Sequence, residues 1–150
     1  METTVRPLQI SSIIGSQFPK IVIPKIDNAK SQIKIVVFDW RWYPNDTGNP
    51  CQLFNQSIVR AVGRGVRVSV VTNNNDILET LREVGCEAKK LITKNLVHAK
   101  LMIIDDITVI IGSHNYTQSA FTMNYEISVM YDDAESAKNF TSFFNNLNGF

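Results

Sequence analysis

The sequence is poor in several features that define whole classes of protein. Its two cysteines, Cys51 and Cys86, are too few and too far apart for a disulfide framework or a cysteine-based metal site. No apolar run approaches the roughly 18 residues that a membrane span needs. The N-terminal stretch holds one arginine and no sustained apolar segment, so it does not resemble a secretory signal. These absences predict a protein of the reducing cytoplasm, with no stable membrane association.

An excess of charge of either sign is also missing. The formal net charge is +1, with 19% charged and 44% hydrophobic residues, which are ordinary values for a globular domain. A general nucleic-acid binder is usually more basic, so we expect any contact with DNA or RNA to be local to one site. The length suits one domain, which we place at residues 20–150. Residues 1–19 show no clear periodicity and are predicted to form an arm or tail.

Apolar runs alternate with amphipathic segments along the chain. These patterns predict helices at residues 23–34, 51–62, 73–84 and from 132 or 133 onward. They predict strands at residues 35–40, 66–71, 96–104, 107–111 and 127–130. Alternating elements of this kind favour an α/β fold, here a three-layer α/β/α domain with a mixed central sheet.

Two polar residues interrupt the apolar run at residues 96–104. Because alternate residues of a strand share a face, His98 and Lys100 are expected to point the same way. An unpaired charge is costly to bury, so a histidine and a lysine on one face of an apolar strand indicate a functional site. Taken alone, the pair also fits a lysine that reaches water beside a buried core histidine.

Further polar residues follow at short, fixed spacings. They form three patterns, H-x-K-x4-D from His98, G-S-x-N from Gly112 and N-x-E from Asn124. Together these patterns resemble the phospholipase D superfamily, and most closely its small single-motif endonucleases. The resemblance is strong over residues 94–130 and weaker over residues 20–93. It implies the phospholipase D/nuclease type of α/β fold and a phosphodiesterase activity.

The residue types suit attack on an anionic phosphodiester. Lys100 offers a positive charge, and the Ser113 hydroxyl and Asn115 amide offer neutral donors to phosphate oxygens. A neutral His98 imidazole can attack phosphorus and form a phosphohistidine that water later hydrolyses. The attacking nitrogen must be unprotonated, so the other ring nitrogen should donate to an orienting acceptor. This chemistry needs no metal and no cofactor.

Each of the two acidic residues of the patterns fits two roles. The resemblance implies that Glu126 is the acceptor that orients His98, although Glu126 also fits a cross-strand partner for a lysine. Asp105 belongs to the catalytic pattern. Its position at the tip of the predicted hairpin fits a turn residue equally well, and we expect a structural or supporting role for it.

One copy of the motif leaves the reaction incomplete. The leaving oxygen needs a proton, which a histidine acting as nucleophile cannot deliver in the same step. The chain has one other histidine, His114, in the variable position of G-S-x-N, where we expect it to point away from the phosphate. The resemblance therefore implies a homodimer with one shared active site. His98 of one subunit would be the nucleophile, and His98 of the other would be the general acid and then the base.

Three functions are compatible with these residues. The sequence favours a metal-independent nuclease acting on DNA or RNA. The alternatives are a phospholipase D-type lipid phosphodiesterase or transphosphatidylase, and a catalytically silent nucleic-acid-binding module. Lipid enzymes of this superfamily usually carry two motifs, and no amphipathic membrane-binding helix is evident. The aromatic run Trp40–Tyr43 fits either base stacking or cover for the core or the dimer interface.

Overall fold

The central element of the fold is a mixed sheet. The computed structural model describes residues 7–91 and 93–148. In that part of the chain the strands are β1 Ser11–Ile14, β2 Gln32–Val37, β3 Arg67–Thr72, β4 Glu87–Ala88, β5 Leu101–Ile104, β6 Thr108–Gly112 and β7 Ile127–Asp132. They lie in the order β1-β7-β6-β5-β2-β3-β4. The β2–β3 and β3–β4 pairs are parallel and the others antiparallel, which confirms the predicted mixed sheet.

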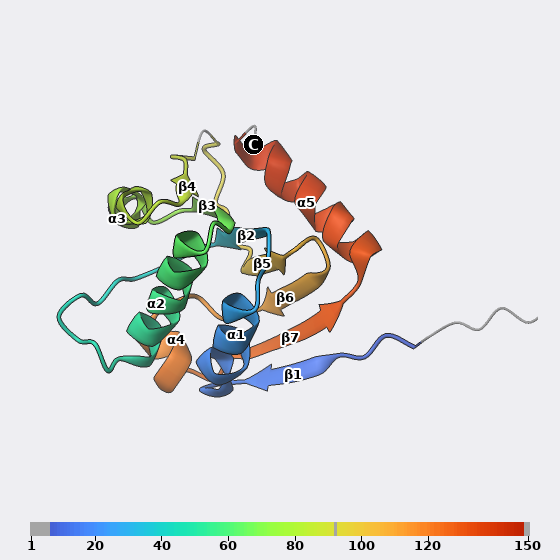
Figure 1. The fold of residues 1–150 in the computed structure, drawn as a ribbon, viewed down its shortest axis with the longest axis horizontal. Helices are drawn as coiled ribbons and strands as arrows, with labels where there is room; N and C mark the ends of the chain where they lie inside the picture. Colours follow the sequence, from blue (N-terminus) through green and yellow to red (C-terminus); the bar gives the residue numbers. More distant parts are fainter. Residues whose placement is uncertain (1–6, 92, 149–150) are drawn as a thin grey trace, which may run out of the picture.

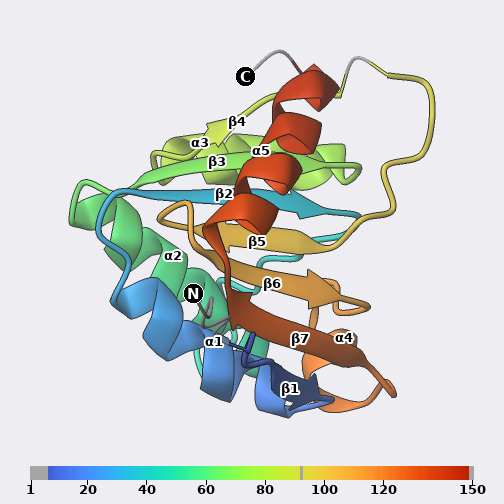
Figure 2. The same cartoon turned by 90° about the vertical axis from the view of Figure 1, so that its right-hand side faces the viewer.

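Helices cover both faces of this sheet. They are α1 Gln17–Asp27, α2 Pro50–Gly63, α3 Leu78–Glu83 with the short 3-10 turn η1 Asn75–Ile77 before it, α4 Gln118–Thr122 and α5 Ala134–Asn148. Helix α5 crosses one face over β2, β3, β5 and β6, whereas α1 and α2 lie on the opposite face (Figures 1 and 2). The predicted three-layer α/β/α architecture is confirmed.

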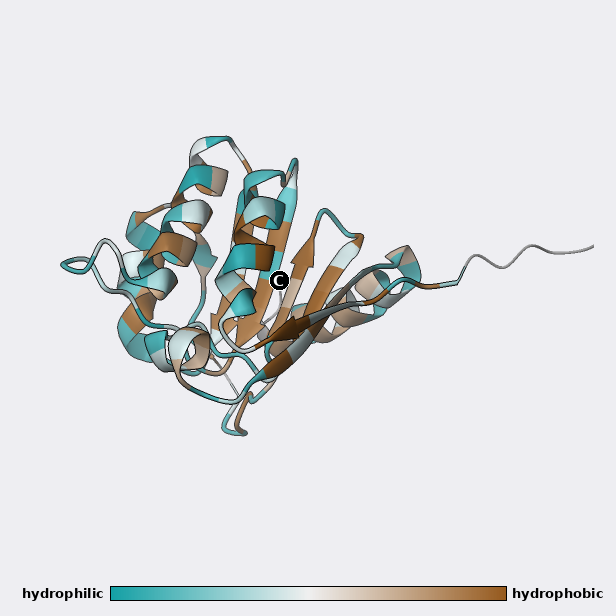
Figure 3. Ribbon diagram, turned by 90° about the horizontal axis from the view of Figure 1, so that it is seen from below, coloured by the Kyte–Doolittle hydropathy of each residue, from teal (hydrophilic) through white to brown (hydrophobic). Residues whose placement is uncertain are grey.

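Two apolar clusters fill the spaces between the layers, and apolar residues accordingly concentrate on the strands and the inner faces of the helices (Figure 3). The larger cluster lies on the α1–α2 side and is centred on five aromatic rings, those of Phe18, Trp40, Phe54, Tyr116 and Phe121. Trp40 is fully buried, and its Nε1 donates a hydrogen bond of 2.7 Å to Asn55. Trp40 therefore covers the core and is not available to stack on a base.

The N-terminal segment differs from the prediction of an arm or tail at residues 1–19. Strand β1 pairs antiparallel with β7, and Phe18 is buried in the larger cluster. Residues from Ser11 onward therefore belong to the domain, although residues 1–6 of the predicted arm lie outside the described part. The signal was weak because β1 is a four-residue edge strand with one buried side chain, Ile13.

The first helix also lies earlier than predicted. It spans residues 17–27 instead of 23–34, with Pro24 inside its last turns rather than at its start. Proline suits a helix start because it lacks a backbone N–H, whereas inside α1 Pro24 leaves the helix without the hydrogen bond that residue 24 would donate to the carbonyl of residue 20. Ile33 falls within the predicted helix, yet in the structure it is one of the buried residues of β2.

The hairpin of β5 and β6 is confirmed, and its tip is fixed by Asp105. Asp105 and Asp106 have φ values of 53° and 58°, as a type I′ turn requires. The Asp105 carboxylate accepts hydrogen bonds of 2.8, 2.8 and 3.1 Å from the backbone N–H groups of Lys30, Ser31 and Gln32. This carboxylate therefore ties the hairpin tip to the start of β2.

We expect Asp105→Asn to destabilise the fold by about 1–3 kcal/mol at neutral pH, because a charged acceptor of four hydrogen bonds is lost, three from backbone N–H groups and one from the Ser31 hydroxyl. Burial works to raise the pKa of Asp105, but the N–H groups of residues 30–32 outweigh it and hold the pKa below 3.8. The stability that Asp105 contributes should therefore be present above that value and lost as the pH falls through the folded pKa. Urea unfolding at several pH values measures this.

The matched control is Asp106→Asn in the same turn. The Asp106 carboxylate is 54% exposed and binds Lys34 and Gln32 at the surface, so its loss should cost less than 1 kcal/mol. Equal losses in the two variants, or a gap between Asp105→Asn and the unmodified protein that persists in strong acid, would contradict the assignment.

Candidate functional site

The predicted site residues gather at one edge of the sheet. Strands β2, β3 and β6 run in the same direction, so their C-terminal ends meet the first residues of β5 and β7 there. The loops at this edge supply five of the six predicted residues, namely His98, Lys100, Ser113, Asn115 and Glu126. Asp105 lies at the opposite edge, where it holds the hairpin tip.

His98 and Lys100 lie in the extended segment before β5, rather than within the strand as predicted. They nevertheless meet, since Lys100 Nζ is 3.0 Å from Nδ1 and 3.2 Å from Nε2 of His98. The lone pairs of an imidazole lie in the ring plane and point away from each other. An ammonium this close to both nitrogens therefore cannot lie along the direction of either lone pair. The ammonium therefore packs on the ring.

An aromatic side chain that the sequence patterns did not identify lies against both residues. The Phe38 ring centroid is 5.0 Å from that of His98, and Lys100 Nζ is 5.6 Å from the centroid of Phe38. Phe38 follows the apolar strand β2, so its sequence signal is the same as that of a core residue. An aromatic face attracts cations, and Phe38 is therefore placed to hold the Lys100 ammonium near His98.

The Lys100 ammonium is partly shielded from water. Burial lowers the pKa of Lys100, and the negative charge of Glu126 opposes that shift. A cation in a partly desolvated position interacts more strongly with an incoming anion than one in bulk water. The structure therefore places a partly desolvated positive charge beside the imidazole.

Ser113 and Glu126 form a second polar group at the same edge. Ser113 Oγ donates to Glu126 Oε1 at 2.6 Å and accepts the Ile127 N–H at 3.0 Å. Asn124 Nδ2 donates to Glu126 Oε2 at 3.1 Å. A serine hydroxyl has one proton, so this hydrogen bond competes with the predicted donation from Ser113 to phosphate. Among the described residues no hydrogen bond joins Glu126 to His98, and the orienting role of Glu126 stays a prediction.

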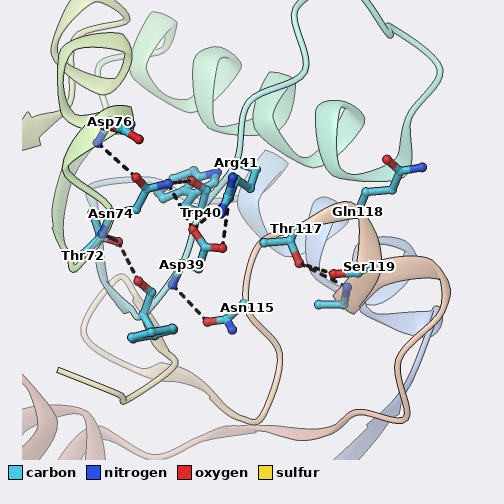
Figure 4. A network of polar contacts seen from close by, with 12 residues as sticks. Asp39, Trp40, Arg41, Thr72, Asn74, Asp76, Asn115, Thr117, Gln118 and Ser119 are labelled. Atoms are coloured by element: carbon cyan, nitrogen blue, oxygen red, sulfur yellow. Dashed lines mark hydrogen bonds and ion pairs between the residues drawn. The ribbon is translucent and has the colours of Figure 1, made fainter. Parts of the chain in front are cut away.

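The amide of Asn115 is oriented by the backbone after β2. Asn115 Oδ1 accepts a hydrogen bond of 3.1 Å from the N–H of Asp39 (Figure 4). Only the oxygen of the amide can accept this hydrogen bond, so the bond identifies which end of the Asn115 side chain is the oxygen. The NH₂ group is then left to donate to another partner. Asp39 was not identified from the sequence, because a backbone N–H leaves no trace in residue type. The arrangement supports the prediction that Asn115 donates to an anion.

Gly112 allows β6 and β7 to approach closely beside the site. A Cβ on Gly112 would overlap the side chain and Cα of Ser128 and the carbonyl of Ile127. The Ser128 Cα and the Ile127 carbonyl oxygen are backbone atoms, so β7 would have to move to admit a side chain at residue 112. The glycine of G-S-x-N is therefore required by strand packing.

His114 is sequestered in the core, with 1% of its surface exposed. Its Nε2 lies 2.9 Å from the Gly15 carbonyl oxygen, and its Nδ1 lies 2.7 Å from Ser128 Oγ. A carbonyl can only accept, so Nε2 carries the proton and Nδ1 accepts from the Ser128 hydroxyl. Both nitrogens are occupied, in agreement with the expectation that His114 points away from a phosphate.

The described residues offer neither a metal-binding cluster nor a membrane-spanning helix. Across residues 7–91 and 93–148, no three His, Cys, Asp or Glu side chains gather into a group that could hold a metal ion. In the same ranges no helix combines the length and apolar character needed to cross a bilayer.

Residues 22–148 match the protein family described as cardiolipin synthase, phospholipase D-like domain. A curated relative, a phospholipase D of Rickettsia bellii, is 27% identical over 127 residues, which cover 81% of this chain and 59% of the relative. The chain spans about three fifths of the length of the curated relatives that it matches.

Two solved structures share the fold along nearly the whole chain. Nuc from Salmonella typhimurium, a phospholipase D family member, has a TM-score of 0.77 at 22% identity, covering 93% of this chain and 94% of that chain. NucT from Helicobacter pylori has a TM-score of 0.76 at 21% identity, covering 94% and 96%. At such identities the likeness is one of fold.

We expect His114 to make stability fall in mild acid. Burial lowers the pKa of His114, against the opposing effects of the Gly15 carbonyl and the Glu126 charge. The folded protein then binds fewer protons than the unfolded chain, so this stability is present above about pH 6.5 and lost as the pH falls toward the folded pKa. His114→Ala should remove that slope. It should also cost about 1–3 kcal/mol at pH 8, because two buried partners lose their hydrogen bonds.

Urea unfolding at pH 8 and pH 5.5 tests this expectation. His98→Ala is the matched control, because it removes the exposed histidine and should leave the slope in place. If His114→Ala kept the full slope, the buried imidazole would not be its source.

Proposed function

Because the chain belongs to the family of phospholipase D-like domains, we propose that it is a metal-independent phosphodiesterase that cleaves DNA or RNA through a phosphohistidine. The observation that carries this proposal is the contact of the Lys100 ammonium with the His98 imidazole. A nucleophile approaches an anionic phosphodiester best when a fixed cation already counters the charge. The Asn115 NH₂ group, oriented by Asp39, supplies a neutral donor at the same edge.

The reaction proceeds in two displacements. A nitrogen of His98 attacks phosphorus, and an N–P bond forms as the P–O bond to the leaving group breaks. The leaving oxygen keeps the electron pair of that bond and takes a proton from a general acid. Water then attacks phosphorus, loses a proton to the same group, and the N–P electron pair returns to His98. Lys100 and Asn115 hold the non-bridging oxygens throughout.

The general acid in this scheme is a second imidazole. His114 cannot serve, because it is buried and both of its nitrogens are hydrogen-bonded. We infer that the protein is a homodimer in which His98 of the partner subunit gives the proton and later takes one from water. Twofold symmetry would place both copies of His98 at one phosphate.

An exposed apolar surface beside the site supports the homodimer. Helix α5 leaves the β1–β7 end of its sheet face uncovered (Figure 2). On that face Ile14 and Ile127 are 59% and 66% exposed and are cross-strand partners, and Val129 beside them is half-buried. We call these three residues the uncovered sheet face. It is continuous with the site through Glu126, which precedes Ile127, and we propose that it packs against its own copy.

The curated relatives named phospholipase D support a second candidate, a lipid phosphodiesterase or transphosphatidylase. The single motif favours the nucleic-acid substrate, as in the small endonucleases that the sequence resembles. A third candidate, a silent nucleic-acid-binding module, would keep the anion contacts without turnover.

We expect the protein to cleave labelled DNA or RNA in the presence of EDTA. His98→Ala should abolish turnover, and Lys100→Ala should lower kcat roughly a hundredfold or more, the usual cost of one preorganised donor to an oxyanion. Lys94→Ala, at an exposed lysine of the preceding loop, is the control and should change kcat little. The assay panel should include DNA, RNA and anionic phospholipid vesicles.

Each arm of that panel decides between candidates. Activity lost in EDTA and restored by a divalent cation would contradict metal independence. Cleavage of phospholipid without cleavage of DNA or RNA would establish the lipid candidate, and binding of nucleic acid without turnover would establish the silent module.

We also expect a dimer in sedimentation equilibrium, and we expect Ile127→Glu to convert it to a folded monomer with little activity. A charge on an exposed strand position is tolerated by the monomer but is costly to bury in an apolar interface. Leu53→Glu is the matched control, because Leu53 is 49% exposed on α2, away from this face. A dimer that survives Ile127→Glu would rule out the uncovered sheet face, whereas a fully active monomeric wild type would rule out the shared site.

A further inference from the structure

Three consecutive asparagines, Asn73–Asn75, follow β3 at the edge that carries the candidate site. The sequence predicted only that a helix begins here, and Asn74 does cap the start by accepting a hydrogen bond of 3.0 Å from the N–H of Asp76. The side-chain amides of Asn73 and Asn74 make further contacts that an N-cap does not need. Each contact leads to a different predicted site residue.

Asn73 acts on the segment that carries His98. Its side-chain nitrogen donates a hydrogen bond to the carbonyl of Val97, the residue directly before His98. The Val97 side chain is buried in the apolar cluster under α5. The backbone before His98 is therefore held at two points, by apolar packing on one side and by the Asn73 amide on the other.

Asn74 acts on Asn115 through the backbone after β2. Its Nδ2 donates to Asp39 Oδ1 at 3.1 Å and to the Trp40 carbonyl at 2.9 Å (Figure 4). These two bonds hold the Asp39 side chain and the Trp40 carbonyl, and they thereby restrain Asp39, whose N–H binds Asn115 Oδ1. The Trp40 side chain is fully buried in the core. The Asn74 amide therefore binds a short segment that is already held by apolar packing at Trp40.

We propose that Asn73 and Asn74 are positioning residues for the two halves of the site, Asn73 for the His98 nucleophile and Asn74 for the Asn115 phosphate donor. The side-chain nitrogens of both asparagines already donate to protein groups, so we assign them no direct contact with the substrate. The assignment of separate kinetic effects rests on the function proposed above, whereas the assignment of structural effects does not.

The two roles predict different kinetic losses. A displaced nucleophile slows the chemical step, and small displacements of reacting groups cost up to about a hundredfold in rate. A misdirected Asn115 weakens a contact that also holds the phosphate in the ground state, and loss of such contacts raises KM. Asn73→Ala should therefore lower kcat, whereas Asn74→Ala should mainly raise KM.

The test uses the full chain, with bis(p-nitrophenyl) phosphate as substrate and inorganic phosphate as competitive inhibitor. We expect Asn73→Ala to lower kcat roughly 10- to 100-fold with a phosphate inhibition constant near that of the wild type. We expect Asn74→Ala to raise both KM and the phosphate inhibition constant several-fold. Asn73→Asp keeps the size but lacks the amide donor, and it replaces Asn73→Ala if that variant does not fold.

Asn75→Ala is the matched control. Asn75 is the same residue type at the next position, it is exposed, and the described structure shows no side-chain hydrogen bond for it. It should retain the wild-type kcat, KM and phosphate inhibition constant. If the Asn73 and Asn74 variants matched Asn75→Ala in all three constants while the wild type was active, the positioning roles would be wrong and the proposed function would stand.

A measurement that does not require turnover separates the two proposals. In NMR spectra, Asn73→Ala should move the ring resonances of His98 and leave the side-chain NH₂ resonances of Asn115 in place, and Asn74→Ala should do the reverse. Asn75→Ala should move neither. An inactive wild type that shows this pattern would overturn the proposed function alone, whereas unmoved resonances in both variants would overturn the positioning roles.

Discussion

The site depends on the close approach of β6 and β7 at Gly112. Because no side chain separates the strands there, Ser113 can pair with Ile127 through its N–H, at 2.9 Å, as well as through its hydroxyl. The same approach places Ser128 against His114 and Glu126 against Ser113. One missing Cβ thus sets the positions of an acidic side chain at the site and of a histidine in the core.

Most polar groups around the site are already paired, and this determines what remains for a ligand. The carboxylate of Glu126 binds Ser113 and Asn124, and the oxygen of Asn115 binds the Asp39 N–H. Buried polar groups in proteins are normally satisfied in this way. The half-buried Lys100 ammonium and Asn115 NH₂ keep donors to spare, and both groups favour an anion.

Long apolar patterns predicted the fold well, and short or ambiguous ones did not. The hairpin of β5 and β6, the strands β3 and β7 and the helices α2 and α5 follow from runs whose periodicity is clear. Strand β1 was not predicted because an edge strand buries few side chains and so leaves a weak apolar pattern in the sequence. The end of α1 was misplaced because Ile33 satisfies helical and strand spacing alike, and only its pairing with β3 and β5 decides between them.

The sequence by itself determined the chemistry available to this protein, since the residue types His98, Lys100 and Asn115 and their spacing are fixed along the chain. The tertiary structure alone decided how these groups are held. Phe38, Asp39 and the asparagines after β3 reach the site from other strands, and two of their contacts use backbone atoms, which every residue type possesses. It also separated Asp105 from the rest of its motif. Strand β5 crosses the sheet from the site to the hairpin tip. Lys100 before it and Asp105 after it therefore lie at opposite edges of the sheet, although they are close in sequence.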